Sequence, residues 1–320
     1  MVEIVICDWK EIDVRNLAVI TFESRQASKL EATSVDAIEN YLQSLQERFP
    51  AEATFIAYQD GKIVGWAGIE RESPTSGEIG RWHPYVLPIQ DQDDIAMQLV
   101  EGMMNYARKS GMSRVEISFG DVTEETTGSY ETYSKWYSKY DVTKYSEIAF
   151  MVFDINDPLL QQSELQDGVT IKKLAGVEIE GLYQCYYETF SSGQDRNFFD
   201  HDESQKRASF DRSFVDADNI NEEISSVLMV DDKLAGFALI RSRDNEEHLD
   251  MLGIHPDYRR RGLGKYLILD VMKRVTKLDV DVVSIGVDSI NSHALDLYKK
   301  VGFKTVTRII VHSWKDEEKK

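Results

Sequence analysis

The chain has 320 residues and a formal net charge of −19, with 56 acidic side chains against 37 Lys and Arg. So acidic a surface argues against nucleic acid as a partner. The chain contains no run of about 18 apolar residues, and it does not open with the basic and apolar pattern of a signal peptide. We therefore expect a cytoplasmic protein with no membrane partner. Cys7 and Cys185 are too few for a disulfide framework or a zinc cluster.

The first half of the chain alternates between strand and helix patterns. Apolar alternation predicts strands, and apolar residues three and four apart predict helices. The expected strands are 2–7, 54–58, 63–69, 114–119 and 146–153, and the expected helices are 14–25, 35–47, 95–110 and 129–140. We expect the strand at 146–153 to close this first unit. The polar residues 154–167, which include Pro158, predict a domain boundary.

The second half repeats this order. Residues 226–240 (SVLMVDDKLAGFALI) echo residues 55–69 (FIAYQDGKIVGWAGI), and both predict a hairpin. The internal repeat indicates an α/β fold with two tandem copies of one unit. We expect a mixed, mostly antiparallel sheet flanked by helices in each copy, with domains at residues 1–155 and 168–320.

One stretch combines a strand, a glycine-containing loop and a helix. Apolar residues predict a strand at 249–254 and recur at helical spacing after Gly264. Between them, residues 259–264 read RRRGLG, the pattern R-x-x-G-x-G. Glycines let the backbone approach a ligand closely, and the unbonded N–H groups of a first helical turn attract phosphate. Residues 251–278 hold seven Lys and Arg against two acidic residues, so we expect this stretch to bind a phosphorylated cofactor.

The pattern resembles the acetyl-CoA loop of the GNAT N-acetyltransferase superfamily, whose signature is Q/R-x-x-G-x-G/A. A second motif follows in the family's order, because residues 291–303 (NSHALDLYKKVGF) match N-x-x-A-x-x-L-Y-x-x-x-G-F. The resemblance implies that a strand backbone pairs with the pantetheine arm of acetyl-CoA and that the loop holds its pyrophosphate. The residues so implied are Leu252, Gly253, Ile254, Arg259, Arg260, Arg261, Gly262, Leu263, Gly264, Lys265 and Asn291.

The corresponding segment of the first half lacks these features. Residues 88–95 (PIQDQDDI) contain three acidic residues but no glycine. The negative charges of these acidic residues would repel a pyrophosphate. We therefore expect a degenerate GNAT-like domain followed by a catalytic GNAT domain with the acetyl-CoA site. This tandem arrangement is similar to that of mycothiol synthase and related two-domain acetyltransferases.

Acetyl transfer to an amine needs a base for the ammonium and an acid for the departing thiolate. The resemblance places Tyr298 where the family has its acid, although a tyrosine on an amphipathic helix also suits a core position. His248 stands where many members have a glutamate base, and Asp250 lies two residues further on the same strand face. A histidine titrates near neutral pH, whereas this carboxylate would act through water. Both are candidates for the base, and this chemistry requires no metal.

These patterns predict an acetyl-CoA-dependent N-acetyltransferase in which an amine attacks the thioester directly. The alternatives are a non-catalytic acyl-CoA-binding or scaffold protein on the same fold, and acyl transfer to a hydroxyl or thiol. We expect a small-molecule amine or a peptide N-terminus as acceptor, and a monomer or homodimer. The acidic segment 195–223 indicates a cationic acceptor if Asp195, Asp200, Asp202 and Glu203 line its cleft, but a solvated loop explains it equally well.

Overall fold

The protein forms two compact units. The computed structural model describes residues 2–30, 32–48, 50–80, 82–123, 125–156, 167–195, 198–199, 201–217, 219–243 and 246–316. The first unit comprises residues 1–147 and 307–320, and the second comprises residues 148–306. No helix in the described part of the chain has both the length and the apolar composition to cross a bilayer.

The first unit contains a mixed sheet with the strand order β1-β2-β3-β4-β6-β13, and β5 pairs with β3. β4 and β6 run parallel, and the other neighbours are antiparallel. The strands are β1 (Val2–Cys7), β2 (Ala51–Gln59), β3 (Lys62–Ser73), β4 (Ser76–Glu78), β5 (Tyr85–Val86), β6 (Arg114–Val122) and β13 (Lys304–Lys315).

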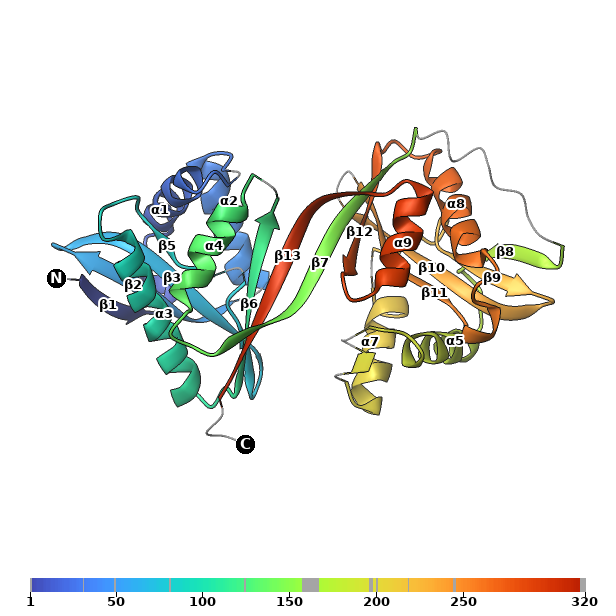
Figure 1. Cartoon of the computed structure of the whole chain (residues 1–320), viewed down its shortest axis with the longest axis horizontal. Helices are drawn as coiled ribbons and strands as arrows, with labels where there is room; N and C mark the ends of the chain where they lie inside the picture. Colours follow the sequence, from blue (N-terminus) through green and yellow to red (C-terminus); the bar gives the residue numbers. More distant parts are fainter. Residues whose placement is uncertain are drawn as a thin grey trace. The chain divides into compact units, whose positions relative to one another are not determined.

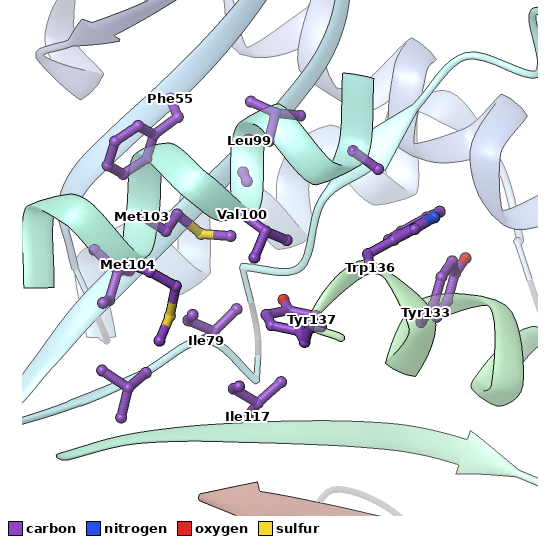
Figure 2. Packing of buried hydrophobic residues seen from close by; sticks show 14 of the residues in the cluster. Phe55, Ile79, Leu99, Val100, Met103, Met104, Ile117, Tyr133, Trp136 and Tyr137 are labelled. Atoms are coloured by element: carbon purple, nitrogen blue, oxygen red, sulfur yellow. The ribbon is translucent and has the colours of Figure 1, made fainter. Parts of the chain in front are cut away.

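Helices cover both faces of this sheet. They are α1 (Val14–Ala27), α2 (Val35–Arg48), α3 (Gln92–Lys109) and α4 (Thr127–Trp136). Successive strand residues point to opposite faces, so Phe55 packs with the residues of α3 and α4 while Ile56 packs with those of α1 and α2. Figure 2 shows Met103 of α3 and Tyr137, just after α4, gathered over the first of these faces.

The second unit repeats the same plan. Its sheet has the order β7-β12-β11-β10-β9-β8, and here β11 and β12 form the parallel pair among antiparallel neighbours. α8 and α9 lie on one face of the sheet, with α5 and α7 on the other (Figure 1). This confirms a mixed, mostly antiparallel sheet flanked by helices in each unit. The elements are β7 (Val142–Asp154), β8 (Val169–Lys173), α5 (Ile179–Ser191), α7 (Glu203–Phe214), β9 (Ser226–Val230), β10 (Lys233–Arg243), β11 (Glu246–Ile254), α8 (Leu263–Val275), β12 (Val282–Asp288) and α9 (Ser292–Val301).

The last strand of each sheet comes from a distant part of the chain. Residues 148–154 of β7 pair with β12 in the second unit, and residues 308–315 of β13 pair with β6 in the first. The prediction that residues 146–153 close the first unit is therefore wrong, and the compact units differ from the expected halves 1–155 and 168–320. The strand itself was predictable from its apolar alternation. Its partner was not, because the backbone groups of every strand edge offer the same hydrogen bonds.

The polar segment 195–223 contains a helix that the sequence analysis did not predict. The Asp202 carboxylate accepts a hydrogen bond from the Gln205 N–H, and the Gln205 side chain accepts one from the Asp202 N–H, which together form a capping box. Phe210 and Phe214, four residues apart, are buried against the sheet. These two local signals mark α7, although the remaining residues of the segment are strongly polar.

The first unit should depend on the C-terminal strand. Trp314 is 3% exposed within the core of that unit, and the Arg108 guanidinium lies 5.1 Å from its ring centroid. Trp314→Ala should destabilise the first unit by about 3–5 kcal/mol, because it leaves a large cavity. Hydrogen exchange should accelerate at residues 95–104 and stay unchanged at 263–275. Val306→Ala, at a 52% exposed position of the same strand, is the control. Faster exchange confined to residues 263–275 would contradict the strand assignment.

Candidate active site

Helix α8 begins at a glycine in the left-handed conformation. Gly262 is its N-cap with φ of 78°, and no side chain caps the helix there. A β-carbon added to Gly262 would meet no heavy atom within 4 Å, so the space beside the first turn is open. The uncapped N–H groups and the positive end of the helix dipole favour an anion at this position.

A second glycine brings the loop, the strand and α9 together. A β-carbon on Gly264 would lie 3.1 Å from Cδ2 of Leu297 on α9 and 3.6 Å from Cγ1 of Ile254 at the end of β11. The contact to Leu297 is tighter than an ordinary van der Waals contact, so a larger residue would push α8 away from α9. The two sequence motifs therefore meet in space at Gly264.

The parallel pair of strands separates beside this loop. The described ladder between β11 and β12 pairs Glu247 with Val283 and His248 with Ser284, and no further residues. β11 nevertheless continues to Ile254. Residues 249–254 therefore pair with β10 on one side and have no paired strand on the other in the described structure. The backbone of Leu252, Gly253 and Ile254 belongs to this segment, so an extended ligand could pair with it as an added strand.

Gly253 is required at its position for packing. A β-carbon there would lie 2.5 Å from Cζ of Phe237 and 3.0 Å from Cγ2 of Thr189 on α5. These distances are too short for real contacts, so an alanine would force either the aromatic ring or α5 to move. The absence of a side chain at residue 253 thus lets α5 approach the end of β11.

The two candidate bases have different surroundings. His248 is 6% exposed, and its Nδ1 lies 2.7 Å from the Ser284 hydroxyl, which in turn donates to the Glu246 carboxylate at 3.1 Å. Asp250 forms an ion pair with Arg241, with 2.9 Å between Oδ2 and Nε.

Asp250 stands at a bulge of β11. Leu239 pairs with Met251 and Ile240 with Leu249, so Asp250 is an extra residue that opposes none on β10. Such a bulge interrupts the two-residue alternation and redirects a side chain. His248 contacts Ser284 on β12. Asp250 contacts Arg241 on β10, the residue that pairs with His248 in the ladder.

Tyr298 and Asn291 both lie on α9. Tyr298 is 5% exposed, and its ring meets that of Phe303 edge to face at 5.6 Å. Burial raises the pKa of its phenol, so the side chain keeps its proton through the neutral range. Asn291 is the N-cap of α9, where its Oδ1 accepts from the Ala294 N–H at 3.2 Å. Both residues thus have a structural role whether or not a ligand is bound.

The cations of the loop fall into two groups. Arg259 donates to the carbonyl oxygens of Ile254, Ser192 and Thr189 at 2.9, 3.1 and 2.7 Å, and burial lowers its pKa. It therefore ties the end of β11 to the end of α5. The side chains of Arg260, Arg261 and Lys265 are exposed near the start of α8, and Arg261 also donates to the Asp257 carbonyl oxygen at 3.0 Å.

The sequence analysis missed one pair of residues near the end of β11. His255 Nε2 hydrogen-bonds with the carboxylate of Glu188 on α5. The hydrogen bonds that Glu188 accepts, first from Gln184 and then from His255, lower its pKa. His255 follows the strand and precedes Pro256, a position that could have been singled out. Its partner lies 67 residues earlier in the chain, so no local pattern connects the two.

The acidic segment has mostly local partners. Asp195 accepts from the Phe198 N–H at 2.9 Å, and Asp202 caps α7. Glu203 pairs with Lys206 at 2.8 Å and accepts from the Tyr187 hydroxyl at 3.2 Å. Asp200 lies outside the described residues. Across the described part of the chain, no group of three or more His, Cys, Asp and Glu side chains could hold a metal ion.

Comparison with known proteins identifies the family. The profile described as Acetyltransferase (GNAT) domain matches residues 198–314, and that described as Acetyltransferase (GNAT) family matches residues 15–137. The chain therefore belongs to the GNAT acetyltransferases and carries two GNAT domains in tandem.

Individual relatives match over shorter stretches. The ribosomal protein bS18-alanine N-acetyltransferase of Salmonella typhimurium is 31% identical over 80 residues, which are 25% of this chain and 54% of the relative. The chain spans about half the length of the first curated relatives that it matches, 48% and 54%.

Solved structures agree over nearly the whole chain. A GCN5-related N-acetyltransferase from Sphaerobacter thermophilus has a TM-score of 0.69 at 16% identity, covering 98% of this chain and 95% of that one. A tandem GNAT protein from the clavulanic acid biosynthesis pathway has a TM-score of 0.63 at 14% identity, covering 98% of both chains. At such identities the likeness shows the fold alone.

Arg259 should contribute to stability more than to anion binding. Arg259→Gln removes charged donors from three carbonyl groups and should lower the free energy of unfolding of the second unit by about 1.5–3 kcal/mol. Arg260→Gln, at an exposed loop position, should change it by less than about 0.5 kcal/mol. Urea unfolding and hydrogen exchange at residues 189–192 would measure both. Equal stability of the two variants would show that the Arg259 contacts do not hold α5 against β11.

Proposed function

We propose that this protein is an acetyl-CoA-dependent N-acetyltransferase whose active site lies in the second unit. The observation that carries the proposal is the meeting of three features around Gly264. They are segment 249–254 of β11, which has a neighbouring strand on one side only, the glycine N-cap of α8 and the α9 helix that bears Tyr298.

The residues present fit acetyl-CoA. Gly262 leaves open space at a helix N-terminus, where the exposed Arg260, Arg261 and Lys265 can balance a pyrophosphate. Leu263, the first residue of α8, would contribute its backbone N–H to the same anion. Leu252 to Ile254 offer backbone groups to the amide-containing pantetheine arm. We assign Arg259 to the support of this site, because its donors already bind backbone carbonyls.

The chemistry follows from the groups beside the separated strands. Acetyl-CoA supplies an activated acyl group, and an amine attacks its carbonyl carbon only after losing a proton. The C–S bond then breaks, and the sulfur takes a proton. Tyr298 suits this last step because burial keeps its phenol protonated.

Hydrogen-bond direction favours His248 as the base. A carboxylate only accepts, so the Ser284 hydroxyl gives its one proton to Glu246 and accepts from His248 Nδ1. The neutral ring then has its basic lone pair on Nε2, where it can take the proton of the amine. Asp250 is the second candidate, but its carboxylate is engaged by Arg241. The chain Glu246–Ser284–His248 would also stabilise the imidazolium once it forms.

The acceptor is proposed to be an amine, either a small molecule or a peptide N-terminus. The alanine N-acetyltransferase of Salmonella typhimurium has a peptide acceptor by its name, which supports the second choice. Asp195, Asp202 and Glu203 already have partners nearby in the chain. Their carboxylates are therefore weaker support for a cationic acceptor than the count of acidic residues alone indicates.

Thiol release from acetyl-CoA in the presence of amines and peptides tests the proposal. Gly262→Asp should weaken acetyl-CoA binding by about 1–4 kcal/mol, because it adds a negative charge near the pyrophosphate. Gly176→Asp is the matched control, since Gly176 has a φ of 82° and equally open surroundings in the same unit. Binding without any turnover would instead favour a non-catalytic acyl-CoA-binding protein. Unchanged affinity in Gly262→Asp would place the ligand elsewhere.

Tyr298→Phe tests the acid. The change keeps the ring and removes the proton donor, so turnover should fall by roughly 10²–10⁴ while acetyl-CoA affinity stays nearly constant. Tyr133→Phe is the matched control, because Tyr133 is the seventh residue of α4 just as Tyr298 is the seventh of α9. If turnover persists and only thermal stability drops, Tyr298 is a core residue and not the acid.

A further inference from the structure

The first unit contains a cavity of its own. Its volume is about 190 Å³, and it lies among α1, α2, β5, β6 and α4. The cavity occupies the place in this unit where the parallel strands part. β4 pairs with β6 at residues 76–78, and β6 then continues to Val122 without β4. The corresponding parting of strands in the second unit holds the candidate active site.

Aromatic rings form much of the cavity wall. His83 stacks on Phe119 with ring centroids 4.9 Å apart and on Tyr133 at 6.1 Å. Tyr130 meets Phe119 edge to face at 5.4 Å. Tyr133, which lines the cavity, projects from α4 in Figure 2. A volume of about 150 Å³ is enough for benzene, so this cavity can hold a single aromatic ring with small substituents.

His83 supplies an unused acceptor. The residue is 8% exposed, and burial lowers its pKa to about 4, so the ring is neutral at pH 7. Its Nε2 lies 2.5 Å from the Ser118 carbonyl oxygen, and a carbonyl can only accept, so Nε2 carries the proton. Nδ1 is therefore an acceptor, and it is buried with no hydrogen-bond partner in the described structure. A ligand that carries a hydroxyl group would satisfy it.

Arg25 supplies a positive charge. It is the only Lys, Arg, Asp or Glu among the residues that line the cavity. It hydrogen-bonds with Tyr85, whose pKa burial raises to about 12, so that phenol stays neutral beside the guanidinium. A carboxylate is the group that a guanidinium binds most strongly in such a setting.

We propose that the first unit binds a single-ring aromatic carboxylate that bears a hydroxyl group. The ring stacks among His83, Phe119 and Tyr133, the carboxylate pairs with Arg25, and the hydroxyl donates to Nδ1 of His83. The site binds and does not acylate, because residues 88–95 supply no glycine loop for a cofactor. The first unit thereby acts as a receptor for a small anion.

Calorimetry on the full chain tests the proposal with 4-hydroxybenzoate as the probe. We expect one equivalent to bind. Benzoate lacks the hydroxyl, phenol lacks the carboxylate, and cyclohexanecarboxylic acid lacks the aromatic ring. Each should therefore bind at least roughly tenfold more weakly than 4-hydroxybenzoate. Hydrogen exchange should slow at residues 127–136 and stay unchanged at 263–275. No binding at about 10 mM probe, or equal binding of all four compounds, would overturn the proposal.

Two variants locate the carboxylate. Arg25→Met should weaken 4-hydroxybenzoate at least about tenfold and leave phenol unchanged. Arg15→Met is the matched control, because Arg15 lies on the same helix and pairs with Asp36 and Glu39 outside the cavity. Gly262→Asp should leave probe affinity at the parent value, which separates this site from the acetyl-CoA site. Equal effects of the two Arg variants would overturn the role of Arg25. Loss of 4-hydroxybenzoate binding in Gly262→Asp would show that the probe binds to the second unit. If Arg25→Met does not fold, the four-compound series on the parent chain still decides the question.

Discussion

The early end of a parallel strand pair shapes both units of this protein. In the second unit, β11 and β12 share a ladder of two residue pairs and then separate. The backbone of residues 249–254 is thereby left with a neighbour on one side only. Backbone N–H and C=O groups need partners, so the gap is a natural place for an extended ligand. The last residue of this segment, Ile254, lies beside Gly264 in the first turn of α8.

The two units use the same gap in different ways. In the second unit, the absence of a side chain at Gly253 and at Gly264 lets α5 and α9 approach closely. In the first unit, His83 reaches across to the Ser118 carbonyl, and aromatic rings enclose a small cavity. A strand edge beside a cationic loop suits a long polyanionic ligand, whereas a small aromatic cavity suits a single ring. We propose that the two units, although they share one fold, carry sites of different chemistry.

The exchange of end strands ties each sheet to a distant part of the chain. β13 brings Ile310 and Trp314 into the core of the first unit, although both residues lie near the end of the sequence. β7 brings Met151 and Phe153 into the core of the second. Neither core is complete with residues from one half of the sequence alone. A substitution in either strand is therefore felt in the unit that receives it.

The sequence by itself determined the family, the repeat and most of the elements. Local patterns sufficed for these, because glycine at a helix start, apolar periodicity and turn residues act within a few positions. Only the tertiary structure decided which sheet receives β7 and β13, because the backbone groups of every strand edge offer the same hydrogen bonds. It also assigned the Arg259 side chain to backbone carbonyls and joined His255 to Glu188. It placed Asp250 at a bulge, in an ion pair with Arg241. Such contacts depend on strand register and on packing between residues far apart in sequence, and no local pattern records them.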